Sequence, residues 1–159
     1  MEPKITTIER KLIIGKKLEM SLTKQLTPML WKSFLPIISQ IQNRNSNELI
    51  SFSVYPTDYF QSFDPNTKFE KWAGVEVTNV ADLLPETESF EIVSGMYAEF
   101  IYKGLPSEAG PFYHSIFMEW LPNSGYQLDN RPHFEVMGDK YKNDDPNSEE
   151  MVYIPIIVR

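Results

Sequence analysis

The segment Leu30–Pro36, with the sequence LWKSFLP, is repeated in outline by Ile116–Pro122, with the sequence IFMEWLP. Both segments place apolar or aromatic residues at matching positions and end in Leu-Pro. Three shorter matches keep the same order at separations of 80 to 82 residues: Gly15 and Glu19 with Gly95 and Glu99, Phe52–Val54 with Phe134–Val136, and Trp72–Val75 with Tyr153–Ile156. These ordered matches predict an internal repeat, with half-domains at about 5–80 and 88–158. Two packed half-domains form a cleft at their pseudo-twofold seam, and ligand pockets favour such seams.

Each half of the chain has the pattern strand-helix-strand-strand, from runs that alternate or follow helical spacing. The expected strands cover 5–22, 49–55, 69–77, 90–102, 133–137 and 151–158, and the expected helices cover 28–41 and 111–122. Pro36 lies inside the first helical pattern and should kink or shorten that helix. The predicted fold class is therefore α+β: one domain over 1–159, with antiparallel sheets, helices on one face and a pseudo-twofold ligand cleft.

Composition excludes several classes of function. The formal net charge is −7, which argues against nucleic acid as a partner, because phosphate binding needs clustered Lys and Arg. The chain has no cysteine and two histidines, so disulfides, thiolate metal sites and multi-histidine metal sites are not available. We therefore predict no metal and no cofactor.

No apolar run approaches the roughly 20 residues that a membrane-spanning helix needs. The first residues, Met1–Lys4, lack the apolar core of a secretion signal. The sequence therefore predicts a cytoplasmic protein without a membrane partner.

Glu135 is the strongest candidate for a functional side chain. It alternates with Phe134 and Val136, so it points to the opposite face of its strand. If those two residues pack under the helices, Glu135 faces the cleft. Its counterpart in the first half is Ser53, so the acid breaks the pseudo-symmetry, as expected of a group that orients a ligand. The alternative is an ordinary strand acid that faces solvent.

Aromatic side chains are candidates for the walls of the cleft, because aromatic faces attract organic cations. The alternative for each is a place in the core. His133 lies two residues from Glu135 on the same strand face and could touch a ligand or influence the carboxylate. The acids at 139, 144, 145, 149 and 150 lack the spacing of a calcium loop and are expected in a solvated loop.

The chain resembles the GyrI-like small-molecule-binding domain, the effector-binding domain of AraC- and MerR-type transcription regulators. The resemblance runs from about 5 to 158, and is carried by the order and spacing of several segments: Leu30-Trp31 with Phe34, Gly74–Val77, Gly95–Phe100, Lys103-Gly104, Asn123–Tyr126, Arg131–Val136 and Tyr153–Ile156. It implies the same duplicated fold, and a pocket whose acid, at the position of Glu135, pairs with cationic or lipophilic organic ligands.

The resemblance also implies which residues line the pocket. The expected ligand-binding set is Glu135, His133, Trp31, Tyr55, Trp72, Tyr97, Tyr113 and Tyr153. Family members often carry a second acid on the last strand, where this chain has Met151. Glu150 lies one residue earlier and would reach the pocket only after a shift in register.

Three functions follow from these features. The first is a standalone protein that binds a small organic molecule, with no catalytic residue. The second is a hydrolase of a strained electrophile, in which Glu135 activates water and Tyr97 assists. The third is an inhibitor of a protein partner, resembling gyrase inhibitors, although no concentrated acidic run marks an interface.

Overall fold

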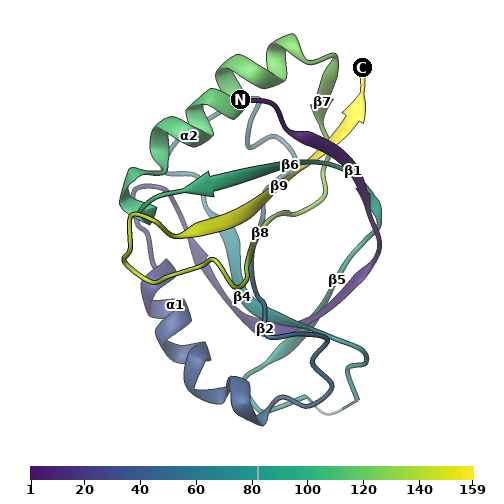
Figure 1. Ribbon diagram of the computed structural model, residues 1–159, viewed down its shortest axis with the longest axis vertical. Coiled ribbons are helices and arrows are strands. Elements are labelled where there is room, and N and C mark those ends of the chain that lie inside the picture. The colour runs from purple at the N-terminus through teal and green to yellow at the C-terminus, as the bar shows by residue number, and fades with distance from the viewer. Residues whose placement is uncertain (82) are drawn as a thin grey trace.

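The computed structural model describes residues 1–81 and 83–159, and it has the predicted α+β architecture. A single antiparallel sheet carries two helical segments on one side, as Figure 1 shows on its left. The strands are β1 Lys4–Ile8, β2 Lys11–Met20, β3 Leu49–Val54, β4 Phe69–Val77, β5 Glu88–Ile92, β6 Gly95–Lys103, β7 Tyr126–Leu128, β8 His133–Met137 and β9 Glu149–Val158. The main helices are α1 Thr27–Phe34 and α2 Gly110–His114. None of the helices in these described ranges is long and apolar enough to span a membrane.

The centre of the sheet is the antiparallel pair of β3 and β8. The strand order is β1-β6-β9-β8-β3-β4-β2-β5, with β7 paired to β9. Phe52 lies opposite Phe134, and Ser53 lies opposite His133. On either side of this pair the order of elements is the same, because β3 is followed outward by β4 and β2, and β8 by β9 and β6.

The two long strands expected at 5–22 and 90–102 are each broken into two. The first becomes β1 and β2 and the second becomes β5 and β6. The break allows an exchange between the halves, since β1 pairs with β6 and β5 pairs with β2. The sequence showed only continuous extended residues, and it gave no sign that the two parts of each run pair with different strands.

The strand register corrects one of the sequence matches. Gly15 lies opposite Gly74 and Tyr97 lies opposite Pro155. Gly74 and Pro155 are themselves matched by the alignment of Trp72–Val75 with Tyr153–Ile156. Gly15 therefore corresponds to Tyr97, and the match of Gly15 with Gly95 is wrong by two residues.

Both helices depart from regular α-helix near their ends. After α1, the chain continues as the 3₁₀ segment η1 Leu35–Gln40, so Pro36 shortens the α-helix as expected. After α2, the chain forms the π-helical segment η3 Ser115–Trp120 and then the short 3₁₀ segment η4 Leu121–Asn123. A further 3₁₀ turn, η2 Pro106–Glu108, precedes α2.

Four apolar clusters form the core of the described residues, and the smallest joins Met20, Tyr59 and Phe69. The other three fill the two sides of the sheet. One lies beneath α1 and includes Leu30, Phe34 and Val75. A second lies beneath α2 and η3 and includes Phe100, Ile116 and Val152. The third is on the opposite face and joins residues from β1 and β5, at the two ends of the strand order, with Phe52, Trp72, Tyr97 and Phe134. Strands so far apart in the order share one cluster because the sheet curls around it (Figure 1).

Arg131 ties the start of β6 to the loop before β8. Its guanidinium group donates to the carbonyl oxygens of Met96 and Ile156 at 2.7 and 3.1 Å, and pairs with Asp129 at 2.6 Å. It also lies 4.6 Å from the centre of the Tyr97 ring. Gly95 leaves the space for it, because a Cβ atom at that position would be 2.2 Å from Nη1 of Arg131.

We expect Gly95→Ala to lower the free energy of unfolding by about 1–3 kcal/mol, because the anchored guanidinium cannot move away without losing its partners. Gly110→Ala is the matched control, since no heavy atom lies within 4 Å of a Cβ at that position. Urea unfolding of both variants measures the difference. Equal stability of the two variants would contradict this account of Gly95.

Candidate functional site

Glu135 is buried on the side of the sheet that carries the helices. Its Oε1 accepts a hydrogen bond from the Tyr113 hydroxyl of α2 at 2.8 Å. Its Oε2 is 3.8 Å from Nζ of Lys71, and the two side chains are 17% and 14% exposed. Oε2 is buried and has no hydrogen-bond partner among the described residues. The solvent-facing alternative for this acid is therefore wrong.

Glu135 points away from Phe134 and Val136, as alternation along the strand predicts. The face that each of them takes differs from the arrangement considered from the sequence. Phe134 and Val136 pack in the cluster on the face away from the helices. Glu135 therefore points to the helix side, over the centre of the sheet and between the two helices. The condition under which Glu135 was expected to face the cleft, that Phe134 and Val136 pack under the helices, is not met.

Lys71 brings a positive charge from the first half to this acid of the second half. It lies on β4 opposite Ser53, and its Nζ donates to Oγ of Ser53 at 3.2 Å. Ser53 in turn lies opposite His133 on the neighbouring strand β8. The site is therefore built across the β3–β8 seam, with one basic and one acidic side chain from different halves.

Glu150 is a second acid on the same face. It lies on β9 opposite Tyr102, and its strand neighbour Val152 lies opposite Glu135. The pKa of Glu150 is raised to about 7, chiefly by burial and also by the nearby Glu135, whereas Lys71 opposes the rise. The expected solvated loop is therefore wrong for Glu150, because β9 begins at Glu149 and holds it against the sheet. Met151 points the other way and packs against the opposite cluster.

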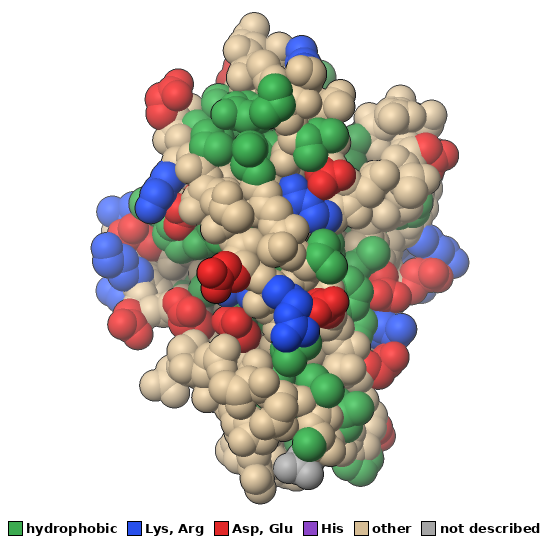
Figure 2. All heavy atoms as spheres, turned by 90° about the vertical axis from the view of Figure 1, so that its right-hand side faces the viewer, with side chains coloured by type: hydrophobic (Ala, Val, Ile, Leu, Met, Phe, Trp, Pro, Cys, Tyr) green, Lys and Arg blue, Asp and Glu red, His purple; other side chains and the backbone are tan. Residues whose placement is uncertain are grey.

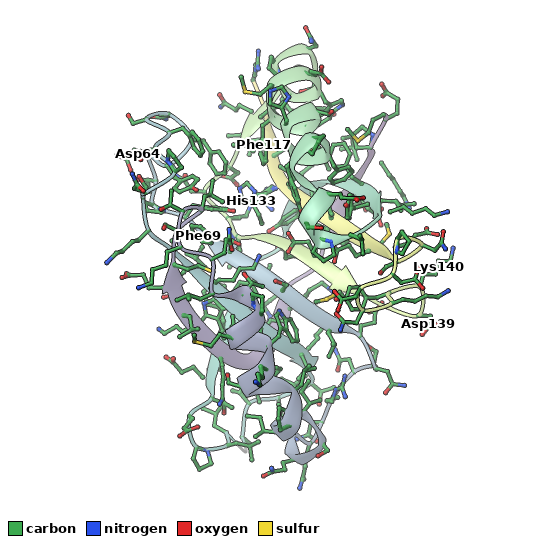
Figure 3. The ribbon with its side chains drawn as sticks, turned by 90° about the vertical axis from the view of Figure 1, so that its left-hand side faces the viewer. Asp64, Phe69, Phe117, His133, Asp139 and Lys140 are labelled. Carbon is green, nitrogen blue, oxygen red and sulfur yellow. The ribbon has the colours of Figure 1, made fainter. Side chains whose placement is uncertain are left out.

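His133 is enclosed by aromatic rings. The ring of Phe60 stacks on it at 5.2 Å, that of Tyr55 lies edge-on at 4.9 Å, and that of Phe117 is 6.0 Å away. Figure 3 shows His133 and Phe117 close together between the two helices. Burial lowers the pKa of His133 to about 3, with a smaller contribution from Lys71. The imidazole is therefore neutral at physiological pH.

A pocket opens beside this aromatic group. It has a volume of about 220 Å³ and is lined by residues 54–57, 60, 61 and 127–133. A second pocket of about 680 Å³ lies between the first residues of the chain and the end of η3, with Trp120 and Tyr126 in its wall. The acids that line the second pocket, Glu2 and Glu119, are exposed. The first pocket is the better candidate, because Tyr55, Phe60 and the buried His133 line it, although Glu135 and Lys71 are not among its lining residues.

The predicted ligand-binding residues fall into two groups. Tyr113 and His133 lie with Glu135 on the helix side. Tyr55 adjoins them through its contact with His133 and through the charge of Glu135, which, after burial, helps to raise its pKa. Burial and Glu135 likewise raise the pKa of Tyr113 well above its usual value.

Trp72, Tyr97 and Tyr153 lie on the opposite face, so their expected contact with Glu135 is wrong. Trp72 stacks on Phe52 at 5.1 Å and Tyr153 stacks on Phe134 at 4.5 Å. Tyr97 is completely buried and donates a hydrogen bond to the Pro132 carbonyl oxygen at 2.9 Å. These three rings form the core inside the curled sheet.

Trp31 is half-buried on α1, where it packs edge-on against Phe34 at 6.0 Å, in the cluster beneath that helix. Trp31 is therefore a core residue of α1. Tyr113 of α2, in contrast, contacts Glu135 through its hydroxyl group.

Three residues on this face were not predicted from the sequence: Lys71, Phe60 and Phe117. Glu150 was considered only as an acid that a shift in register would bring to the pocket. Lys71 could have been found, because it alternates with Trp72 on β4 and so lies on the other face. Phe117 lies at helical spacing with other apolar residues, and this spacing is typical of a core position. Phe60 lies in the turn after β3, where no periodicity predicts a direction.

The fold and the buried acid between two helices define a ligand-binding α+β domain. A family model described as the GyrI-like small molecule binding domain matches residues 1–157. The chain belongs to the GyrI-like family. No curated protein matches the sequence.

Solved structures of low sequence identity share the fold. SAV2435 bound to tetraphenylphosphonium superposes with a TM-score of 0.73 at 16% identity, covering 99% of this chain and 94% of that one. The EcmrR C-terminal domain gives a TM-score of 0.67 at 14% identity, with 99% and 98% covered. A hydrolase from Listeria innocua gives 0.60 at 10% identity, with 98% and 92% covered.

Because the pKa of His133 is lowered in the folded state, the stability of the protein should depend on pH through this residue. Between pH 6.5 and about 3 the unfolded chain binds a proton at His133 that the folded chain does not. The free energy of unfolding therefore decreases as the pH falls through this range. We therefore compare the free energy of unfolding of wild type with that of His133→Phe, which keeps an aromatic ring. The advantage of the variant should grow by about 2–3 kcal/mol when the pH falls from 7.5 to 4.5.

Urea unfolding of the two proteins at both pH values measures this difference. Taking the difference between the proteins cancels the opposite effect of Glu150, which is common to both. Parallel pH dependences would show that His133 has the same pKa in the folded and the unfolded chain, and would contradict this account.

Proposed function

We propose that this protein binds an amphipathic organic cation between its two helices, with the charge of the ligand next to Glu135. The observation that carries the proposal is the buried Oε2 of Glu135, which has no hydrogen-bond partner among the described residues. Nζ of Lys71, at 3.8 Å, forms an ion pair with this oxygen but is too far away to donate a hydrogen bond to it. A buried acceptor without a donor is costly, and a ligand that supplies a donor or positive charge offsets that cost.

The surroundings of Glu135 suit the rest of such a ligand. Tyr55, Phe60, Phe117 and Tyr113 present rings on the same side of the sheet, and each aromatic face attracts a cation by about 0.5–2 kcal/mol. The tetraphenylphosphonium bound to SAV2435 is a ligand of this class, on the same fold. A micromolar dissociation constant, about −8 kcal/mol, is within the reach of one charge contact and several rings.

In this proposal the pocket lined by Tyr55, Phe60 and His133 widens toward Glu135, which does not line it now, to admit a ligand of this size. Its volume of about 220 Å³ is below the roughly 300–1,000 Å³ of typical small-molecule sites. Phe60 is the side chain that would move, because it lies in a turn and its ring stacks on His133 and, at 5.2 Å, on Phe117. In this proposal a ligand ring takes the place of the Phe60 ring between those two residues.

We do not expect nucleic acid as a partner. Figure 2 shows acidic and basic side chains intermixed over the face that carries β1 and β5. Two of the basic side chains are paired, Arg10 with Glu91 at 2.6 Å and Lys17 with Glu88 at 3.4 Å. A mixed surface on an acidic chain gives little attraction for phosphate. A cytoplasmic location and a protein partner both stay predictions.

Hydrolysis is a second candidate function, because of the hydrogen bond between Tyr113 and Glu135 with Glu150 nearby. Two acids whose environments differ can serve as acid and base in one reaction. Tyr113 takes the assisting role expected of Tyr97, which lies on the other face. Turnover of a strained electrophile by the wild type, lost in Glu135→Gln, would support this function.

We expect Glu135→Gln to weaken the binding of tetraphenylphosphonium by about 1–3 kcal/mol, the usual loss for a charged partner. Triphenylphosphine oxide, a neutral ligand of related shape, should lose far less. Glu99→Gln is the matched control, because Glu99 accepts a hydrogen bond from Tyr153 at 2.9 Å on the opposite face. Calorimetry with both ligands provides the measurement.

Equal losses of affinity for the charged and the neutral ligand would show that Glu135 maintains the shape of the pocket and does not interact with the charge of the ligand. A loss of cation binding in Glu99→Gln, with Glu135→Gln unaffected, would place the site on the opposite face. Failure of the wild type to bind the cation at all would overturn the proposed function.

A further inference from the structure

One edge of the sheet is open to pairing. β1 is the last strand in the strand order, and within the described part of the chain it pairs with β6 alone. Proteins usually protect such an edge with charged side chains. β5, at the other end of the order, follows this rule, because it carries Glu88 and Glu91. Residues 5–8 of β1, with the sequence ITTI, are instead all uncharged and β-branched.

The hydrogen bonds of β9 show which backbone groups of β1 point to this edge. The carbonyl oxygen of Pro155 accepts a bond from the N–H group of Asp129 at 3.1 Å. Asp129 lies between β7 and β8, so Pro155 points away from β6. In an antiparallel pair, opposite residues point either toward each other or away from each other. Tyr97, opposite Pro155, therefore points to β1, where it pairs with Thr6.

Ile5 and Thr7, the neighbours of Thr6, consequently direct their N–H and C=O groups to the open edge. Apart from the strand pairs, no described residue makes a backbone hydrogen bond with either of them. Their side chains lie on the helix side, since Ile5 is opposite Ala98, which packs in the cluster beneath α2 and η3. In an antiparallel strand added at this edge, the residues that bond to β1 would also have their side chains on the helix side.

The second pocket, of about 680 Å³, lies on the helix side of this edge. Ile5 and the first residues of the chain form one wall, and residues of η3 and η4, among them Glu119 and Trp120, form the other. Figure 1 shows the N-terminus beside the helical segment that follows α2. An unpaired strand beside a side-chain pocket is the arrangement to which an extended peptide adds as a further strand, with alternate side chains in the pocket.

The charge of the second pocket selects the peptide. Glu2 and Glu119 line it, and no lysine or arginine is among its lining residues. Neither acid forms an ion pair with a described residue. Trp120 lines the same pocket, and aromatic rings attract cations. A second copy of β1 would bring no basic side chain here, because Lys4 alternates with Ile5 and so lies on the other face.

We infer that the edge of β1 and the second pocket form a docking site for an extended, basic peptide segment of another protein. The segment pairs antiparallel with β1 through Ile5 and Thr7, and it places lysine or arginine side chains beside Glu119 and Trp120. This site shares no lining residue with the pocket of the proposed function, so each can be tested without the other.

The test is fluorescence anisotropy with a labelled eight-residue peptide of alternating lysine and valine. The wild type should bind it at least about tenfold more tightly than a peptide of alternating glutamate and valine, because the pocket is acidic. Tetraphenylphosphonium should not compete with the peptide.

N-methylated peptides separate pairing with β1 from a general attraction of charges. When the lysine side chains enter the pocket, the lysine N–H groups bond to β1 and the valine N–H groups point outward. Methylation of the lysine backbone nitrogens should therefore weaken binding by about tenfold or more, whereas methylation of the valine nitrogens should change it by less than about twofold.

A charge reversal tests the pocket. Glu119→Lys should weaken binding of the lysine–valine peptide by about fivefold, since it replaces an attraction by a repulsion at an exposed site. Glu108→Lys is the matched control, because it makes the same change of charge at an exposed acid of η2 that does not line the pocket. It should bind the peptide as wild type does.

Equal binding of the two N-methylated peptides, or weaker binding of the valine-methylated one, would overturn the inference. So would equal binding by Glu119→Lys and Glu108→Lys, or competition by tetraphenylphosphonium. Sedimentation of the wild type tests the other occupant: a dimer that the peptide dissociates would assign the edge to a second copy of the chain. The absence of peptide binding would overturn this inference and leave the proposed function standing.

Discussion

The pairing of β3 with β8 is the constraint on which the rest of the structure depends. Phe52 lies opposite Phe134 at this seam, and each stacks on an aromatic residue of the next strand outward, Trp72 or Tyr153. The four rings fill the inside of the curled sheet. Because side chains alternate along a strand, the neighbours of these rings are forced to the other face, between the helices.

This constraint explains why charged groups are buried at the seam. The positions next to the rings are Ser53, Lys71, His133 and Glu135, all on the helix side. Neither α1 nor α2 covers them with an apolar surface, because each helix packs on its own cluster. Lys71 and Glu135 come from different halves and meet over the seam, so the charge of the site depends on the association of the halves.

The sequence predicted the fold class and most strands, because alternation and helical spacing report burial directly. β4 and β8 match their expected bounds. The sequence could not predict the exchange of β1 and β5, since partner choice depends on contacts far apart in the chain. It identified Glu135 but grouped it with Trp72, Tyr97 and Tyr153, because alternation shows that two residues differ in face and not which face the helices cover. Glu150 was expected in a solvated loop because its neighbours are acidic, whereas β9 holds it opposite Tyr102.

The central claim is that the ligand site lies between the helices on the Glu135 face. Nuclear Overhauser effects between the phenyl protons of bound tetraphenylphosphonium and the aromatic side chains test this claim most directly. The structure predicts contacts with Tyr113, Phe117 and Tyr55. Contacts with Trp120 and Tyr126, in the pocket near the N-terminus, or with Trp72 and Tyr97 inside the curled sheet, would contradict it.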